Sequence, residues 1–259
     1  MERILVTGST DGIGLRTAQI LAGRGHEVVT HGRVADRVAA ARDATGKGAV
    51  AAVTADLADL DQVAELAGEA RRLGVTALVN NAGVYCRERV VTLDGHEQMW
   101  QVNHLAPSLL TALMLPDLAP GSRVVNLSSV IHQRGEIDLA DPDFHSRKWH
   151  HFKAHAQTKL AAALMAREYA RRHPGITFLA VHPGMVGTKL LTQGMKVQGT
   201  DSLDEGAATS VFALTQPGLA NGSYLAHEAP AQACPNARDD AVAAELFDHT
   251  FASLGLTFA

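Results

Sequence analysis

The sequence is poor in cysteine, tyrosine and basic charge, and it lacks long apolar runs. Its 259 residues include two cysteines, Cys86 and Cys234, which give neither a disulfide framework nor a metal-ligand spacing. A net charge of −4 leaves no basic field for nucleic acid. No apolar run reaches about 18 residues, so we expect no membrane span. The start, Met1-Glu2-Arg3, leads directly into a strand-like segment, so we also expect no signal peptide and a reducing, cytoplasmic location.

The residues that are present suffice for a packed core, because 46% are hydrophobic and 19% are charged. Strand-like segments are expected at 4–6, 27–30, 49–54, 76–80, 123–127, 176–181 and, as an edge strand, 223–225. Helical patterns cover 13–22, 60–73, 94–115, 150–172, 203–214 and 239–254. Strands that alternate with helices, and that are continuously apolar, indicate a parallel sheet covered on both faces. We therefore predict one α/β domain, a Rossmann-type doubly wound sheet of about seven strands.

A glycine-rich turn follows the first strand-like segment. It reads Thr7-Gly8-Ser9-Thr10-Asp11-Gly12-Ile13-Gly14. Glycines let a backbone approach a pyrophosphate closely, and the helix that follows points free N–H groups and a positive dipole end at the phosphates. This pattern predicts a dinucleotide site. A plain strand-to-helix turn is the competing interpretation.

The second strand-like segment ends in His31-Gly32-Arg33, and no acidic residue occurs before Asp36. In dinucleotide folds an acidic side chain at this point holds the ribose 2′-hydroxyl, whereas an arginine accommodates a 2′-phosphate. Arg33, with Ser9 nearby, therefore favours NADP(H) over NAD(H). The competing interpretation is that Arg33 is a solvated surface charge.

Together, these motifs resemble the short-chain dehydrogenase/reductase family, whose Thr-Gly-x-x-x-Gly-Ile-Gly signature is met by Thr7 to Gly14. The spacing after Ser129 looks most like the retinol-dehydrogenase-like branch. The resemblance implies an oxidoreductase in which Asn103 holds a proton-relay water, Ser129 polarises a carbonyl oxygen and Lys159 binds the nicotinamide ribose. It also implies further cofactor-binding positions at Asp56, Leu57, Asn81, Ala82, Gly83, Pro183, Gly184, Val186 and Thr188.

One position departs from the family pattern. The family's Tyr-x-x-x-Lys segment reads His-Ala-Gln-Thr-Lys here, from His155 to Lys159. None of the three tyrosines, Tyr85, Tyr169 and Tyr224, has a lysine four residues on, so none fills the role by sequence. An imidazole ordinarily titrates near pH 6.5 and serves as a general acid or base, although it reaches less far than a phenol. His155 is therefore the candidate acid/base.

Three functions stay open at this point. In the first, the chain interconverts a carbonyl and an alcohol with NADP(H), using His155 as acid/base. In the second, it is a non-redox dehydratase, epimerase or cyclase with a histidine base. In the third, it binds NADP(H) without turnover. Retention of Asn103, Ser129 and Lys159 argues against the third, since a binding protein does not need all of them.

Substrate specificity is expected in residues 84–92, 131–149 and 190–200, outside the cofactor motifs. Apolar residues in the last range suggest a lid over a lipophilic ketone or aldehyde. Residues 1–185 would form the cofactor-binding and catalytic core, and 186–259 the lid and C-terminal region. We predict no metal site, because the pair His151 and His155 has no carboxylate between its members. The acids Asp138, Asp141 and Asp143 are expected to solvate a loop and form turns. The resemblance leaves a homodimer or homotetramer possible.

Overall fold

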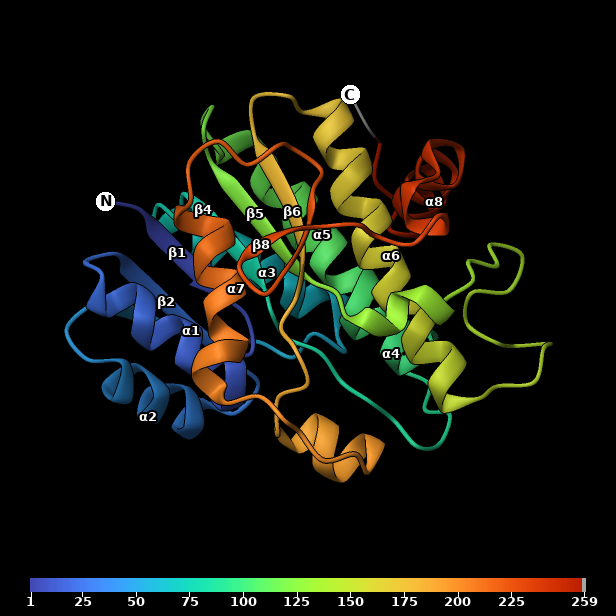
Figure 1. The fold of residues 1–259 in the computed structure, drawn as a ribbon, viewed down its shortest axis with the longest axis horizontal. Helices are drawn as coiled ribbons and strands as arrows, with labels where there is room; N and C mark the ends of the chain where they lie inside the picture. Colours follow the sequence, from blue (N-terminus) through green and yellow to red (C-terminus); the bar gives the residue numbers. More distant parts are fainter. Residues whose placement is uncertain (258–259) are drawn as a thin grey trace.

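The computed structural model describes residues 1–257, and the predicted C-terminal region therefore extends two residues, 258–259, beyond the described part. Across residues 1–257, eight strands form one sheet in the order β3-β2-β1-β4-β5-β6-β7-β8 (Figure 1). The strands are β1 (Arg3–Val6), β2 (Glu27–Gly32), β3 (Ala49–Thr54), β4 (Ala77–Asn80), β5 (Arg123–Leu127), β6 (Thr177–His182), β7 (Tyr224–Ala226) and β8 (Ala229–Ala231). The first seven are parallel, and β8 pairs antiparallel with β7. The strand order reverses between β1 and β4, where open α/β sheets bind ligands.

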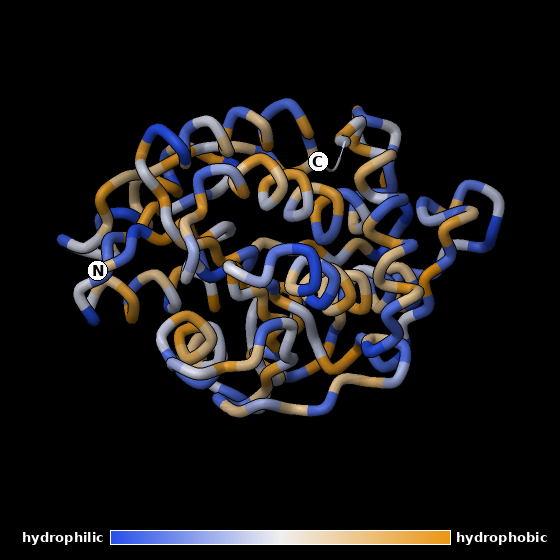
Figure 2. The backbone as a smooth tube through the Cα atoms, turned by 90° about the horizontal axis from the view of Figure 1, so that it is seen from above, coloured by the Kyte–Doolittle hydropathy of each residue, from blue (hydrophilic) through white to orange (hydrophobic). Residues whose placement is uncertain are grey.

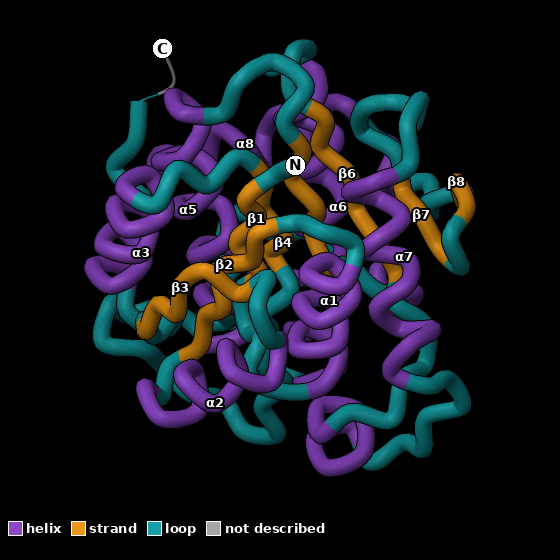
Figure 3. Tube along the Cα trace, turned by 90° about the vertical axis from the view of Figure 1, so that its left-hand side faces the viewer, coloured by secondary structure: helices purple, strands orange, loops and turns teal. Residues whose placement is uncertain are grey.

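Helices cover both faces of the sheet (Figure 3). The α-helices are α1 (Gly12–Gly23), α2 (Ala35–Thr45), α3 (Leu60–Arg72), α4 (Gln98–Trp100), α5 (Ala106–Met114), α6 (His151–Arg172), α7 (Leu203–Thr215) and α8 (Asp240–Ser253). Single turns of other helix types are η1 (Gln101–Leu105), η2 (Leu115–Asp117), η3 (Val130–Arg134), η4 (Leu190–Met195) and η5 (Asn236–Arg238). Helices α1 and α7 pack together on one face, whereas α3, α5, α6 and α8 cover the other.

The core lies on both sides of the strands, as the continuous apolar runs predicted. Successive side chains of a strand point to opposite faces. In β1, Ile4 and Val6 pack with the α1 and α7 side, while Leu5 packs with the α3 and α5 side, and all three are fully buried. Hydrophobic residues accordingly recur along the central elements in Figure 2. The prediction of a single doubly wound α/β domain is confirmed.

Side-chain caps explain where several helices begin. The Asp11 carboxylate accepts a hydrogen bond from the Gly12 N–H at the start of α1, and Asp59 accepts two at the start of α3. Ser202 and Glu205 form a reciprocal capping box at α7. Such caps satisfy N–H groups that have no partner within the helix.

Three elements differ from the sequence prediction. Helix α2 was not predicted, because its apolar pattern is weak: among its residues only Val38, Ala41 and Thr45 are buried. The exposed strand β8 was also missed; it contains Pro230, which is tolerated at the edge of a sheet. The helix predicted over 94–115 begins only at Gln98 and passes through a π-helical turn, η1, before α5.

Within the described range 1–257, no helix is both long and apolar enough to cross a bilayer.

Candidate active site

The glycine-rich turn is held tightly against the end of β4. Gly8 has a left-handed φ of +63°, and a Cβ at this position would lie 2.9 Å from the Ala82 Cα. A Cβ on Gly14 would lie 2.3 Å from the Asn81 Nδ2 and 2.4 Å from the Gly8 carbonyl oxygen. The Asn81 amide donates to the Thr7 carbonyl oxygen at 2.7 Å. The structure therefore brings together the predicted residues of the turn and of the segment after β4.

The N-terminus of α1 also meets the loop after β6. A Cβ on Gly12 would lie 3.3 Å from the Thr188 Cγ2, so the predicted loop residue Thr188 lies over the helix start. Asp11 forms ion pairs with Lys189 at 2.5 Å and with Arg37 at 3.5 Å. The hydrogen bond from Lys189 holds the pKa of Asp11 below its usual value. The glycine-rich turn and the start of the predicted lid are thus in contact.

The adjoining predicted residues have different surroundings. Pro183 is half-buried, Gly184 has a left-handed φ of +91° and Val186 is buried. The Asp201 carboxylate accepts a hydrogen bond from the Met185 N–H at 2.7 Å and so fixes this loop. These contacts place the loop after β6 along the carboxyl edge of the sheet.

His31 forms hydrogen bonds with three segments, a role that its sequence context does not predict. Its Nδ1 accepts a hydrogen bond from the Gly8 N–H at 3.2 Å, and its Nε2 lies 3.1 Å from the Ala55 carbonyl oxygen. The His31 N–H donates to the Ser9 hydroxyl at 2.9 Å. Burial lowers the pKa of His31 to about 4, so the ring is neutral near neutral pH and can accept at Nδ1. No motif flags such a residue, because its role depends on contacts across three strands.

Three other predicted cofactor residues lie at the ends of β2 and β3. Arg33 is exposed, and it forms no ion pair or side-chain hydrogen bond with any described residue in 1–257. The Asp56 carboxylate accepts a hydrogen bond from the Ala58 N–H at 3.0 Å. The Leu57 side chain is buried in the core, so only its backbone is available to a ligand. Among these three, the Arg33 side chain is the one free to receive an anionic group.

Lys159, Asn103 and Gly83 converge at the carboxyl end of the sheet. A Cβ on Gly83 would lie 3.3 Å from the Asn103 Oδ1 and 3.7 Å from the Lys159 Nζ. The Lys159 Nζ donates to the Leu127 carbonyl oxygen at 2.9 Å. Burial lowers the pKa of Lys159 to about 8, so most of the population stays charged at neutral pH. A largely desolvated cation thus lies where β5 ends.

The two serines after β5 have different surroundings. Ser128 is buried, and its hydroxyl donates to the Lys159 carbonyl oxygen at 2.7 Å. Ser129 is half-buried, and among residues 1–257 its hydroxyl forms a single long hydrogen bond, 3.4 Å, which it accepts from the Ile131 N–H. Ser128 therefore joins β5 to α6, whereas the Ser129 O–H remains available to donate to a ligand.

Asn103 lies in the π-helical turn η1, a distortion that is frequent at functional sites. Its Oδ1 accepts from the Val84 N–H at 2.7 Å, and its Nδ2 donates to the Val84 carbonyl oxygen at 3.0 Å and to the Thr158 hydroxyl at 3.2 Å. The side chain thereby fixes the backbone of Val84. Whether Asn103 also holds a water stays a prediction.

His155 is 3% exposed and lies one helical turn before Lys159. Burial, together with the positive charge of Lys159, lowers the pKa of His155 to about 3. The ordinary value near 6.5, expected for an imidazole, does not hold in this environment. Its buried Nδ1 has no hydrogen-bond partner among the described residues. The ring is therefore neutral throughout the physiological range.

Tyr85, which the sequence analysis excluded, lies beside His155. The two rings are edge to face, with centroids 5.1 Å apart. The Tyr85 hydroxyl oxygen is 2.5 Å from the Nδ1 of His151, the first residue of α6. No spacing rule predicts this contact, because 66 residues separate the two side chains. A tyrosine is thus present next to His155, although it comes from another element.

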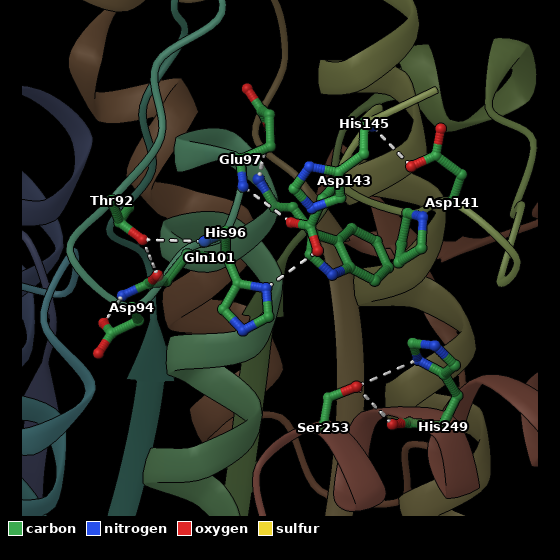
Figure 4. Close-up of polar contacts among 12 residues, drawn as sticks. Thr92, Asp94, His96, Glu97, Gln101, Asp141, Asp143, His145, His249 and Ser253 are labelled. Atoms are coloured by element: carbon green, nitrogen blue, oxygen red, sulfur yellow. Dashed lines mark hydrogen bonds and ion pairs between the residues drawn. The ribbon is translucent and has the colours of Figure 1, made fainter. Parts of the chain in front are cut away.

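Buried acids anchor the loop between η3 and α6 (Figure 4). The Asp143 carboxylate accepts hydrogen bonds from the Glu97 N–H at 2.7 Å and from the His96 Nδ1 at 3.0 Å. Asp141 accepts from the N–H groups that follow it, including that of His145. The prediction of turn formation is confirmed for Asp141. The prediction of solvation is wrong for Asp143, because it is 7% exposed and holds the loop against the start of α4.

The predicted lid contains the π-helical turn η4. A Cβ on Gly194 would lie 3.4 Å from the Tyr85 Cβ, so the lid packs on the ring of Tyr85. Arg87 donates to the Gly194 carbonyl oxygen at 3.2 Å. The segment after β4 and the lid therefore face each other across one end of the sheet, at the position of His155.

Residues 2–198 match the family described as short chain dehydrogenase. The chain belongs to the short-chain dehydrogenase family. Retinol dehydrogenase 13 from Homo sapiens is 40% identical over 202 residues, which cover 73% of this chain and 60% of that protein. Polyprenol dehydrogenase from Mus musculus is 38% identical over 264 residues, which cover 91% of this chain and 78% of that protein.

Two solved structures have the same fold. The crystal structure of an uncharacterized protein from Mycobacterium paratuberculosis is 30% identical with a TM-score of 0.87, and the match covers 100% of this chain and 95% of that one. A short chain dehydrogenase from Burkholderia cenocepacia, in complex with NADP, is 27% identical with a TM-score of 0.70. That match covers 87% of this chain and 95% of the other. The family match and the structural matches therefore agree on one fold.

Proposed function

We propose that this short-chain dehydrogenase is an NADP(H)-dependent oxidoreductase that interconverts a carbonyl and an alcohol on a lipophilic small molecule. The observation that carries the proposal is the convergence of Asn103 and Lys159 around Gly83, with the free Ser129 hydroxyl at the neighbouring strand end. The NADP complex of the Burkholderia relative and the retinol and polyprenol dehydrogenase relatives support it.

The residues present fit a dinucleotide phosphate. The helix start at Gly12 and the close approach of Gly8 to Ala82 leave a side-chain-free surface, and helix N-termini bind anions. Arg33 is exposed and has no ionic partner among residues 1–257, which suits the extra phosphate of NADP(H). A nicotinamide cofactor, when bound, supplies two electrons and one hydrogen to the substrate carbon or takes them up.

In this proposal, Lys159 binds the ribose next to the nicotinamide, and the Ser129 hydroxyl donates a hydrogen bond to the substrate oxygen. The charge of Lys159 is maintained by the Leu127 carbonyl oxygen, which accepts one of its three hydrogens. The remaining two are free for ribose hydroxyls. A hydrogen-bond donor aimed at a carbonyl oxygen stabilises the negative charge that develops there during reduction.

The acid/base role of His155 needs revision in this mechanism. An imidazole with a pKa of about 3 does not become an imidazolium near neutral pH. We therefore assign His155 the role of a neutral group that positions its neighbours, because its ring hydrogen-bonds to the Val84 backbone and packs against the ring of Tyr85. The proton required by the substrate oxygen then comes from a different side chain.

The lid and the segment after β4 support a lipophilic substrate. Tyr85, Val84 and Trp149 pack around the buried side chains of Met99 and Phe144. The lid residue Gly194 closes against the same Tyr85 ring. Aromatic and aliphatic side chains are typical of pockets for apolar ligands.

The test is NADPH oxidation in the presence of aldehydes and ketones of increasing chain length, decanal among them. We expect turnover that rises with chain length and prefers NADPH to NADH. Lys159→Met should abolish turnover, whereas Lys153→Met, an exposed change on the same helix, should not. Conversion of substrate with no net cofactor oxidation would indicate the non-redox alternative. Tight NADPH binding with no product from any aldehyde or ketone tested would indicate the alternative in which the protein binds NADP(H) without turnover.

A further inference from the structure

We propose that Tyr85 is the catalytic proton donor of this site, with His151 as the group that reprotonates it. The proposal rests on the carbonyl–alcohol chemistry proposed above. Its geometric basis is the 2.5 Å contact between the Tyr85 hydroxyl and the His151 Nδ1, directly beside the buried ring of His155. The phenol is thus supplied from the loop after β4 instead of from α6.

The position of Tyr85 is fixed from three sides. Asn103 holds the backbone of the preceding residue, Val84, through both its N–H and its carbonyl oxygen. The ring packs edge-on against His155, and the lid residue Gly194 lies against its Cβ. A general acid must be held at a defined place relative to the atom that it protonates. Tyr85 meets this condition, although it lies on a loop.

The electrostatic surroundings suit a relay through neutral groups. Burial raises the pKa of the Tyr85 phenol, so its proton is retained until a stronger base appears. Partial burial, His150 and Arg87 lower the pKa of His151, which keeps its ring neutral near neutral pH. The positive charge of Arg87 also favours the anionic form of Tyr85. The substrate oxygen becomes strongly basic as the carbonyl is reduced, and it can then take the phenolic proton.

The relay balances in protons. In reduction, the Tyr85 O–H bond breaks, and its proton forms the O–H bond of the product alcohol. The phenolate oxygen takes the proton of the His151 Nδ1–H. The His151 Nε2 takes one proton from solvent water, so His151 changes tautomer and carries no net charge. Before the next turnover the Nε2–H returns a proton to solvent and Nδ1 takes one up, which restores the starting tautomer. The nicotinamide cofactor is the reductant and supplies the two electrons and the hydrogen received by the carbonyl carbon. Oxidation of the alcohol runs through the same steps in reverse.

The first experiment compares single-hydroxyl deletions, with NADPH and decanal as probes. Tyr85→Phe should lower kcat by about 10²- to 10⁴-fold, the usual contribution of a general acid, with NADPH affinity within about twofold of the parent. Tyr224→Phe is the matched control, because the buried Tyr224 hydroxyl has no partner among the described residues and its loss should leave kcat unchanged. A Tyr85→Phe enzyme with the kcat of the parent would overturn the proposal and leave the proposed function standing.

The second experiment does not depend on turnover. The relay requires the His151 Nδ1 to carry the proton, so that the Tyr85 O–H is free for substrate. Nitrogen NMR of ¹⁵N-histidine-labelled protein, with His151→Gln used to assign the signal, should report the Nδ1–H tautomer. The Nε2–H tautomer would mean that Tyr85 donates to His151, and it would overturn the relay. Absence of any NADPH oxidation by the parent across the carbonyl panel would instead overturn both the proposed function and the relay.

Discussion

Replacing Gly14 by alanine should destabilise the protein and disrupt the glycine-rich turn, whereas the same change at Gly68 should stabilise it. Both glycines lie inside helices, Gly14 in α1 and Gly68 in α3. Alanine is favoured over glycine in a helix interior by about 1 kcal/mol, so propensity alone predicts stabilisation at both positions. The two sites differ in the atoms that a new methyl group would contact.

The expected loss of stability in Gly14→Ala follows from contacts with two atoms. Its Cβ would lie 2.3 Å from the Asn81 Nδ2 and 2.4 Å from the Gly8 carbonyl oxygen, both far inside normal contact distance. Relieving such overpacking typically costs about 1–3 kcal/mol. Moving Asn81 also weakens its hydrogen bonds to the carbonyl oxygens of Thr7 and Gly8, at about 1 kcal/mol each. After the gain in helix propensity, a net loss of about 2–4 kcal/mol remains.

Thermal unfolding followed by circular dichroism, together with NADPH binding, measures both effects. A loss of about 1 kcal/mol lowers Tm by about 2–4 °C in a chain of this size. Gly14→Ala should therefore melt several degrees below the parent and bind NADPH weakly. Gly68→Ala should melt slightly above it, since nothing lies within 4 Å of the added carbon. A Gly14→Ala protein at least as stable as Gly68→Ala would refute the close packing of the turn on Asn81.

Three further predictions concern charge and protonation. Asp143→Asn should lower the free energy of unfolding by about 1–3 kcal/mol. It should also lower the raised pKa of His96, and with it remove the stabilisation that this ion pair provides below about pH 6.5 and that is lost as the pH rises through that pKa. Urea titrations at several pH values would measure both effects. Arg33→Ala should weaken NADPH binding by about 10- to 100-fold and leave NADH binding unchanged, and equal losses for both cofactors would contradict the assignment. His155→Gln should leave the pH profile of kcat near pH 6.5 as it is in the parent; an inflection that vanishes in the variant would show that His155 titrates there.

The fold could be predicted from the sequence because its signals are local. The turn from Gly8 to Gly14 and the later strand-end motifs each lie within one segment, and the parallel topology brings strand ends to one edge. The contact between Tyr85 and His151 has no local signal, because it depends on how the loop after β4 packs on the first turn of α6. Proximity in space, more than spacing in sequence, brings Tyr85 beside His151 and His155.

Protonation states also lack a local signal in the sequence. Every histidine starts from the same pKa, and burial, aided at His155 by the charge of Lys159, separates His155 and His31 from an exposed imidazole. The weakly patterned helix α2 and the proline-containing strand β8 were missed for a related reason, because their partners in the fold and not their own residues stabilise them.

The buried neutral histidines make unfolding a proton-consuming reaction in weak acid. Burial lowers the pKa of His31 and His182 to about 4, and that of His104 and His155 to about 3. In the unfolded chain each would titrate near 6.5, so the unfolded state binds more protons below that pH, and the native state loses stability as the pH falls. Each imidazole contributes a slope of about 1.4 kcal/mol per pH unit, or about 5 kcal/mol per pH unit for the four together. These four histidines therefore limit how acidic the solution can become before the protein unfolds. The free energy of unfolding should fall between about pH 6.5 and pH 4.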